Sequence, residues 1–553
     1  MLNQFTSSAY NKIFKIVFGL YSVFAVILIW RSSIVGIDGH RYFILFDDAM
    51  ISMRYASNLV SGHGLVWNIG EKIEGFTNPL MVFIMAGGIR VFGENYAGLF
   101  IELLGLLCLF FNPFLVIKIL NKLLSKRDDF LVFVGVLLVM GWYPIMYWSL
   151  FGMETGFLTT LVLLTVYLSL YKSRPKTVHV LLAVILGLIY LTRPEGALYI
   201  ALFFGFRFLR SIYTKSGWLY VVIEAIITAI PVVAYQLFRL SYYGMSVPNT
   251  YILKNVGMPF LDKVKNGIGF YQPFFDRVEI LVLVVVVFFF VYLFEGSSSL
   301  QEKVSEIIVG KWMMITLFMT SFTVYSVYQI LVGGDAWPPV WRMFAPYAVL
   351  MFIAFIVAAD SLKDSFAIRN DHFMALVSLA VFSFLVFVPY DYHYDFTKLQ
   401  LYPTENNKVN VNSAIAINEL TNASATVAVF AAGTIPYVTH RYSIDPLGKM
   451  DSYIAHLTPD LSGALTSSRG MYSVPGHNKY DLNYSFKEKK PDVIGYLSFY
   501  GHTCTWARDN LEDWCKNNYY LVEYRGAKVF LRKDSKNILW GKLGASNPTL
   551  QSK

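Results

Sequence analysis

The sequence FDDAMISMRYASNLVSGHGLVWNIGEKIEGFTNP, at residues 46–79, places two adjacent carboxylates, Asp47 and Asp48, shortly after the first long apolar run of the chain. Carboxylates beside a membrane are costly unless they face water or a polar substrate, so we interpret the pair as the reactive centre of a membrane-embedded enzyme. After Asp47, apolar residues recur at helical spacing until Gly62 and Gly64, which predicts an interfacial helix. Because Asp is also a favoured helix N-cap, capping is an alternative role for either carboxylate.

The composition is that of a polytopic membrane protein. The chain has 553 residues, of which 56% are hydrophobic and only 15% are charged, and its mean hydropathy is +0.49. Soluble proteins carry about a quarter charged residues. The net charge of +9 lies mostly in short loops, which indicates membrane orientation and not nucleic-acid binding. The run at 16–34 is not followed by a small-residue cleavage site, so we expect a span there and not a signal peptide.

The Lys and Arg clusters predict an N-terminus inside and a C-terminal region outside. The apolar segment 79–92 is short, and we interpret it as a juxtamembrane or re-entrant helix, with a true span as the alternative. Residues 1–390 would form a transmembrane module with a first extracytoplasmic loop at 36–95, and residues 391–553 an extracytoplasmic α/β domain. About eleven spans are predicted, near 16–35, 97–117, 129–148, 153–171, 178–192, 196–212, 218–237, 278–294, 312–332, 343–361 and 373–390.

Charged and polar side chains gather in the predicted outer loops. Basic residues there oppose the positive-inside bias, and a phosphate at the membrane surface would explain them, with lipid headgroups as the alternative ligand. Arg193 and Glu195 could instead satisfy each other as an ion pair. Loops held by a rigid scaffold often carry function. The candidate substrate-binding residues are Arg54, His63, Glu74, Asn78, Arg193, Glu195, Asn249, Lys254, Asp335, Arg342 and His477.

The C-terminal region reads as a small α/β domain. TVAVFA at 426–431, DVIGY at 492–496 and AKVFL at 527–531 predict short strands. Cys504 and Cys515 could form a disulfide if this region is extracytoplasmic, and two free thiols are equally compatible with the sequence.

No nucleotide-binding motif occurs in the sequence, and no cluster has the ligand spacing of a metal site. An outward-facing active site would meet no nucleotide sugar, which favours a lipid-linked donor. We expect no required cofactor or metal, with a divalent cation beside the two carboxylates as the alternative.

Taken together, these segments resemble the GT-C fold glycosyltransferases, in the branch of the mycobacterial terminal arabinofuranosyltransferase. The chain is also similar to bacterial pilin-modifying arabinosyltransferases of this fold. Ala336–Pro339 departs from the pattern, because relatives often have an aromatic residue and a small turn there. The shared motifs run in order from about residue 46 to residue 495: the acidic pair and its RYA-NL run, GMET at 152–155, TRPEG at 192–196, and segments at 242–254, 333–346 and 432–448.

The resemblance implies transfer of a sugar, D-arabinofuranose, from a polyprenyl phosphate to a polysaccharide or pilin-like protein acceptor. The reaction would take place at the outer face of a bacterial cytoplasmic membrane, among membrane lipids. By the same resemblance Asp47 is the catalytic carboxylate, Asp48 supports it, and Lys254 and Arg342 hold the donor phosphate.

A carboxylate could take the proton of the acceptor hydroxyl, or act as a nucleophile if the anomeric configuration is retained. A transporter or flippase of lipid-linked sugars is the alternative function, and a non-catalytic membrane scaffold is a third. A transporter places polar groups at mid-membrane. The polar residues here lie at the ends of predicted spans, which favours an enzyme.

Overall fold

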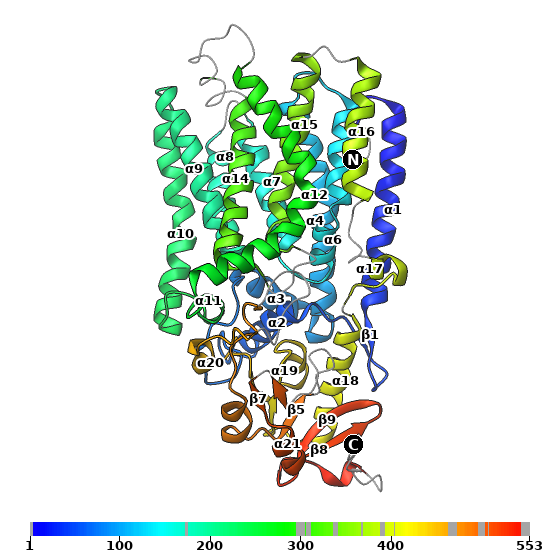
Figure 1. Ribbon diagram of the computed structural model, residues 1–553, viewed down its shortest axis with the longest axis vertical. Helices are drawn as coiled ribbons and strands as arrows, with labels where there is room; N and C mark the ends of the chain where they lie inside the picture. The colour runs from blue at the N-terminus through cyan, green and yellow to red at the C-terminus, as the bar shows by residue number, and fades with distance from the viewer. Residues whose placement is uncertain are drawn as a thin grey trace.

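The protein is described from a computed structural model, which has two parts, a long helical bundle and a smaller α/β part beyond one of its ends (Figure 1). The N-terminus lies on the bundle and the C-terminus on the α/β part. The structure describes residues 4–171, 175–294, 305, 311–335, 341–365, 369–386, 393–402, 404–462, 473–495, 504–506 and 508–543.

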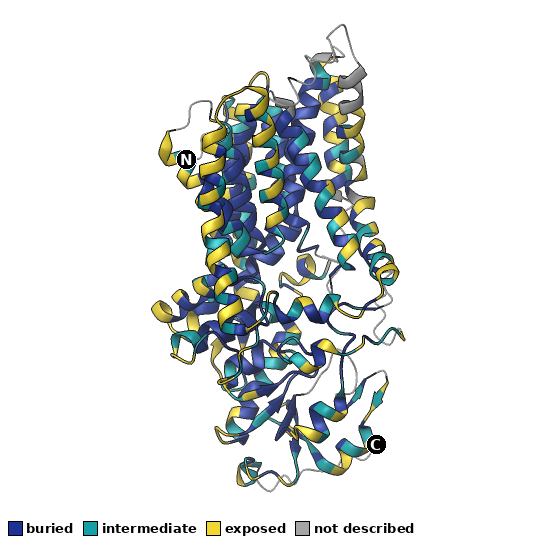
Figure 2. Ribbon diagram, turned by 90° about the vertical axis from the view of Figure 1, so that its left-hand side faces the viewer, coloured by how far each residue is buried: buried dark blue, intermediate teal, exposed yellow. Residues whose placement is uncertain are grey.

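Long apolar helices build the bundle, and each predicted span falls on one or two of them. Exposed residues, many of them apolar, cover its outer surface (Figure 2), as expected where helices face lipid, whereas α15 is enclosed by its neighbours. The helices are α1 (Ser8–Ser32), α4 (Glu94–Leu123), α5 (Asp129–Gly141), α6 (Tyr143–Leu150), α7 (Thr155–Ser169), α8 (Lys176–Thr192), α9 (Gly196–Tyr213), α10 (Trp218–Tyr243), α12 (Phe260–Phe294), α14 (Lys311–Val332), α15 (Ala345–Ser365) and α16 (Asn370–Val386).

The chain is a multi-pass membrane protein. Among the described residues, six helices are long and apolar enough to cross a bilayer (α1, α4, α9, α10, α14 and α15), and the pair α5 and α6 counts as a seventh if it forms one bent span. Helices α3, α7, α8 and α16 are apolar but shorter. The total of eleven spans therefore stays a prediction.

The predicted span at 129–148 is broken in the structure. Helix α5 ends at Gly141, α6 begins at Tyr143, and their axes differ by 46°. Pro144 stands in the first turn of α6, where its missing N–H is tolerated, but the same proline could not continue α5.

Helices α2 (Asp47–Val60) and α3 (Pro79–Phe92) lie between the bundle and the α/β part (Figure 1). The interfacial helix predicted after Asp47 is confirmed, and it ends before Gly62. The segment 79–92 forms a 14-residue helix with Pro79 in its first turn, packed against α2 and α4. Whether α3 crosses the membrane stays a prediction.

The α/β part contains a five-stranded sheet in the order β4-β3-β5-β9-β8. Strand β3 is parallel to β4 and β5, whereas β9 is antiparallel to both of its neighbours. Three of these strands, β3, β5 and β9, lie at the strands predicted from the sequence. Cys504 and Cys515 form a disulfide. The bounds are β3 (Thr426–Ala428), β4 (Tyr442–Ile444), β5 (Val493–Gly495), β8 (Tyr519–Tyr524) and β9 (Ala527–Arg532).

Short elements complete the fold. They are the hairpin strands β1 (Ile34–Val35), β2 (Arg41–Tyr42), β6 (Thr505–Trp506) and β7 (Asp509–Asn510), the helices α11 (Asn249–Asn255), α17 (His393–Lys398), α18 (Thr404–Leu420), α19 (Thr434–Thr439), α20 (Ser452–His456) and α21 (Glu512–Asn518), a π-helical turn at Asn483–Glu488 and a 3₁₀ turn at Trp540–Leu543.

Candidate active site

A cavity of about 440 Å³ opens where the bundle meets the α/β part. Its wall is assembled from seven places in the sequence: the start of α2, the 75–78 loop, the loop before α7, the turn between α8 and α9, the segment from α10 to α11, the region from α14 to α15, and a turn of the α/β part. Seven of the predicted site residues line it: Asp48, Asn78, Arg193, Glu195, Lys254, Asp335 and Arg342.

Asp48 is the carboxylate of the acidic pair that lines the cavity. Its Oδ2 lies 3.1 Å from a guanidinium nitrogen of Arg342, and its Oδ1 accepts a hydrogen bond of 2.7 Å from Nζ of Lys449. The side chain of Asp48 is 31% exposed, whereas that of Arg342 is 7% exposed. The carboxylate is therefore accessible from the cavity and is flanked by two cations.

The side chain of Asp47 does not line the cavity. Its carboxylate accepts hydrogen bonds from the backbone N–H groups of Gly433 and Thr434, at 3.0–3.2 Å, where α19 begins. A Cβ at position 433 would collide with the Asp47 backbone carbonyl, so the close approach requires glycine. Neither aspartate is the N-cap of α2, because Phe46 holds that position and both carboxylates lie in the first turn. The predicted capping of α2 is therefore not found, and Asp47 instead accepts hydrogen bonds from the first backbone N–H groups of α19.

The two carboxylates have opposite electrostatic environments. Burial raises the pKa of Asp47 to about 6, and the neighbouring charge of Asp48 adds to this, against the opposing effects of the Thr434 amide and Lys449. Burial would raise the pKa of Asp48 as well, but Lys449, Arg342 and Lys254 outweigh it and hold that pKa well below its usual range. Asp48 is therefore ionised at neutral pH, whereas Asp47 titrates near pH 6.

A second carboxylate that lines the cavity, Asp335, shares Arg342 with Asp48 and also binds Lys254. Its Oδ2 lies 3.4 Å from Arg342 and its Oδ1 lies 3.3 Å from Nζ of Lys254. Gly476, at a positive φ of 82°, packs against the Lys254 side chain and leaves room for it. Lys254, Arg342 and Lys449 are thus three neighbouring cations linked by two carboxylates, Asp335 between the first two and Asp48 between the last two.

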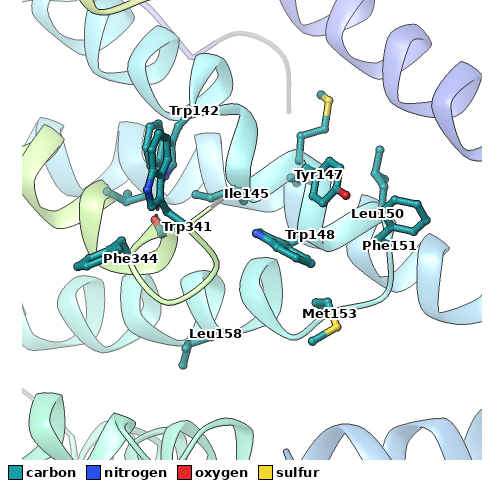
Figure 3. Packing of buried hydrophobic residues seen from close by; sticks show 14 of the residues in the cluster. Trp142, Ile145, Tyr147, Trp148, Leu150, Phe151, Met153, Leu158, Trp341 and Phe344 are labelled. Carbon is teal, nitrogen blue, oxygen red and sulfur yellow. Dashed lines mark hydrogen bonds between the residues drawn. The ribbon is translucent and has the colours of Figure 1, made fainter. Parts of the chain in front are cut away.

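Aromatic packing fixes the position of Arg342. Figure 3 shows Trp341 and Phe344 beside Trp142 and Trp148, at the break between α5 and α6. The rings of Trp341 and Trp142 are stacked with centroids 6.4 Å apart, and the Arg342 guanidinium lies 5.5 Å from the Trp148 ring centroid. The residues on either side of Arg342 are therefore anchored in the apolar core while its charged group reaches the cavity.

Arg193 connects several segments that line the cavity. It donates to Glu195 at 2.7 Å, to Glu154 at 3.1 Å and to the Thr77 hydroxyl at 3.2 Å. Asn78 donates to the other oxygen of Glu154 at 3.0 Å. The predicted Arg193–Glu195 pair exists, and it belongs to a larger network that joins the 75–78 loop to the turn between α8 and α9.

Glu74 and Asn249 support the wall without lining it. Glu74 accepts from Tyr235 and Arg239, each at 2.6 Å, and Arg239 itself lines the cavity. Asn249 donates to the carbonyls of Gly448 and Lys449 at 2.9 and 3.0 Å. These contacts tie the α/β part to α11 and hold Lys449 in reach of Asp48.

Three predicted residues lie elsewhere. Arg54 is buried on another face of α2, where it donates to the Trp67 carbonyl at 3.1 Å and contacts His440 at 2.8 Å. His63 is exposed in the loop after α2. His477 lies near Lys449, Asp48 and Lys254 without lining the cavity, and burial together with the charge of Lys449 lowers its pKa to about 4.

Sequence reasoning missed Lys449 and Glu154. Glu154 stands inside the GMET motif, but its role became visible only through its contacts with Arg193 and Asn78. Lys449 directly follows the motif at 432–448, and the rule applied to basic residues of the outer loops would have selected it as well. Within the described ranges, no group of three or more His, Cys, Asp or Glu residues is placed to hold a metal ion.

The raised pKa of Asp47 predicts a pH-dependent stability. Above about pH 6 the folded protein must ionise this carboxyl, whereas the unfolded chain does so near its ordinary value of 3.8. Between pH 4 and pH 7 the wild type should therefore lose about 2 kcal/mol of stability relative to Asp47→Asn, which does not titrate. Thermal unfolding of both proteins in detergent, followed by Trp fluorescence across this range, measures the difference. A difference that stays constant with pH would contradict the burial of Asp47.

Comparisons with known proteins agree with this architecture. A family model described as a domain of unknown function (DUF8728) matches residues 400–540. The chain is 24% identical over 335 residues to a terminal β-(1→2)-arabinofuranosyltransferase of Mycobacterium tuberculosis, and 26% identical over 345 residues to the protein of that name in Corynebacterium glutamicum. These matches cover 55% and 56% of the chain but 52% and 47% of the relatives. The chain therefore spans about half the length of the curated relatives it matches.

The fold is shared with two solved structures of ArnT over nearly the whole length of the chain. ArnT of Cupriavidus metallidurans in the apo state superimposes with a TM-score of 0.53 at 12% identity, covering 95% of this chain and 98% of ArnT. The ArnT structure bound to undecaprenyl phosphate gives a TM-score of 0.51 at 10% identity, covering 93% and 97%. The resemblance drawn from the ordered motifs is thus confirmed by sequence and by fold.

Proposed function

We propose that this chain is a membrane glycosyltransferase that moves a sugar, D-arabinofuranose, from a polyprenyl phosphate to an acceptor hydroxyl on a glycan or a pilin-like protein. The supporting observation is the set of three cations, Lys254, Arg342 and Lys449, around the accessible carboxylate of Asp48. The sequence similarity to terminal arabinofuranosyltransferases supports the sugar, and the ArnT structure with undecaprenyl phosphate supports the class of donor.

The cations suit a leaving phosphate. When the bond between the anomeric carbon and the phosphate oxygen breaks, its electron pair stays on the phosphate, whose growing charge needs cations that are already in place. Arg342 offers a planar fork for two phosphate oxygens, and Lys254 and Lys449 add point charges. In the free protein Asp48 and Asp335 occupy these cations, so the donor phosphate would displace the carboxylates as it binds.

This exchange would prepare Asp48 for its part in the reaction. Once Arg342 and Lys449 hold phosphate, the main charges that lower the Asp48 pKa are neutralised and the carboxylate becomes a better base. Asp48 then takes the proton of the acceptor hydroxyl as its oxygen bonds to the anomeric carbon. In this proposal Asp47 positions α2 against α19, and the reacting carboxylate of the pair is Asp48.

The position of the site supports an enzyme over the alternative flippase. Lys449 belongs to the α/β part, and the other charged side chains of the cavity stand at the ends of bundle helices or in the connections between them, next to that part. An enzyme acting on a lipid headgroup needs them there. We place this end of the bundle at the outer face of a bacterial cytoplasmic membrane, because the Lys and Arg clusters of the short loops lie at the other end.

Sugar transfer by the purified chain tests the proposal. The protein in proteoliposomes is given polyprenyl-phosphate arabinofuranose, with polyprenyl-phosphate mannose as the comparison donor, and glycans and proteins from cells with and without the gene are compared by mass spectrometry. We expect release of polyprenyl phosphate and a pentose-sized mass difference on one acceptor class. A hexose-sized difference would correct the sugar, and donor crossing the bilayer intact without any transfer would identify a flippase.

A further inference from the structure

A second polar cavity lies at the opposite end of the bundle. It encloses about 180 Å³ among α9, α10, α14 and the end of α7. Helix α10 begins beside this cavity and carries Arg239 of the candidate active site near its other end. Since a helix rises about 1.5 Å per residue, the 26 residues of α10 place its ends about 39 Å apart, which is the thickness of a bilayer with its headgroups.

Two arginines of α9 line this cavity and differ in their partners. Arg207 lies 2.5 Å from Glu224, a fully buried carboxylate that also contacts His179 at 2.5 Å. Arg210 has no ion pair or side-chain hydrogen bond with any residue that the structure describes. Lys215 is exposed in the adjoining turn. Because Glu224 pairs with Arg207 and not with Arg210, the charge of Arg210 is not compensated by any carboxylate among the described residues.

The remaining wall has two kinds of surface. Side chains of Phe203, Val221 and Met314 give an apolar side, and the hydroxyls of Thr214 and Ser216 lie at the open, polar end. Helix α10 starts directly after Gly217, so the positive end of its dipole also lies at this opening. Outside the cavity, exposed apolar residues continue along both helices: Phe208, Leu209, Ile212, Trp218 and Leu219.

We propose that this cavity binds the phosphate of an anionic phospholipid headgroup from the leaflet opposite the candidate active site. Arg210 would bind the phosphate oxygens, and the acyl chains would lie along the exposed apolar faces of α9 and α10. The hydroxyls of Thr214 and Ser216 already donate, to the Arg210 carbonyl and to the Thr214 hydroxyl, so they form the polar rim and are not counted as phosphate ligands. Trp218 stands where aromatic residues anchor helices at the headgroup level. A free anion in water would gain nothing from the apolar wall, and for this reason we assign a lipid.

Lipid binding to the full chain in detergent tests this assignment. The protein is titrated with dioleoyl phosphatidylglycerol, or with dioleoyl phosphatidylcholine as the zwitterionic reference, and bound lipid is measured by native mass spectrometry. Arg210→Gln should weaken phosphatidylglycerol binding about ten-fold, the contribution of one charge-assisted contact. The matched control is Arg369→Gln, which removes an exposed arginine at the start of α16, paired only with Asp371 and His372 among the described residues.

The outcomes separate the assignment from its alternatives. Weaker binding in Arg210→Gln alone, with phosphatidylcholine bound poorly by the wild type, supports the lipid site. An equal loss of phosphatidylglycerol binding in both variants would show an effect of general surface charge and would overturn the assignment. Inorganic phosphate is titrated in a third arm, and thermal stabilisation by phosphate alone that is lost in Arg210→Gln would replace the lipid by a free anion. Sugar transfer is not the readout, so failure of this site leaves the proposed function untouched.

Discussion

Asp48→Asn is expected to leave the protein folded and membrane-inserted but to reduce the turnover number for sugar transfer by about 10³-fold. A positioned base contributes roughly 10²–10⁴ to the rate, and asparagine preserves the shape of the side chain while it removes both its charge and its basicity. The substitution also frees Arg342 and Lys449 from their carboxylate partner. Donor phosphate should therefore bind at least as tightly as in the wild type, so kcat falls while the KM for the donor does not rise.

This separation of kcat from KM distinguishes a reacting carboxylate from a structural one. Asp47→Asn, which alters the contact with α19, should retain far more activity than Asp48→Asn. Asp38→Asn removes an aspartate of the same outer loop outside the cavity and should behave as the wild type. If Asp47→Asn abolished transfer and Asp48→Asn did not, the catalytic role would return to Asp47, as the family resemblance implies.

The bundle and α2 could be predicted because their signals are local. Apolar runs of sufficient length define most of the bundle helices, and the spacing after Asp47 with Gly62 at its end defined α2. The bend between α5 and α6 was not predicted, because the sequence analysis included Pro144 in one apolar run. A proline cannot continue the preceding helix, so it indicates a break at this point. Strand β8, with the sequence YYLVEY, was also missed, although its alternation and aromatic content are typical of a strand.

The candidate site was predictable only as a set of residue types. The charged and polar residues of the predicted outer loops included seven that line the cavity, but no local rule could state which carboxylate of the pair faces it. That choice depends on Gly433, almost 400 positions later, whose amide binds Asp47 and leaves Asp48 for the cations. Arg54 lies seven residues after Asp47, nearly two helical turns, so the two side chains share a face of α2. That face contacts α19 and its flanking residues and does not line the cavity, because Asp47 binds Gly433 and Arg54 contacts His440. The segment 336–340, which contains the departure from the family pattern, lies outside the described residues.

Lys449→Gln is expected to lower kcat/KM for the lipid donor by about 10²-fold, mainly through weaker donor binding. The lysine reaches the cavity from the α/β part, so it would couple that part to the donor phosphate, and a charge-assisted contact of this kind contributes about 1.5–3 kcal/mol. Its loss also removes the charge that lowers the Asp48 pKa most strongly, so that pKa should rise and the acid limb of the pH profile should move to higher pH. Binding of polyprenyl phosphate and a pH–rate profile measure both effects.

A matched pair of variants separates this role from a general effect of charge. Lys536→Gln removes an exposed lysine of the same α/β part, far in sequence from the Asp445–Met450 turn, and should leave kcat/KM unchanged. Lys449→Arg restores the positive charge and should recover part of the donor affinity, because Asn249 still holds the turn. Unchanged donor affinity and an unchanged pH profile in Lys449→Gln would limit this residue to a surface ion pair and leave Lys254 and Arg342 as the phosphate ligands. The shift of the acid limb is the sharper readout, since a purely structural loss would lower the rate equally at every pH.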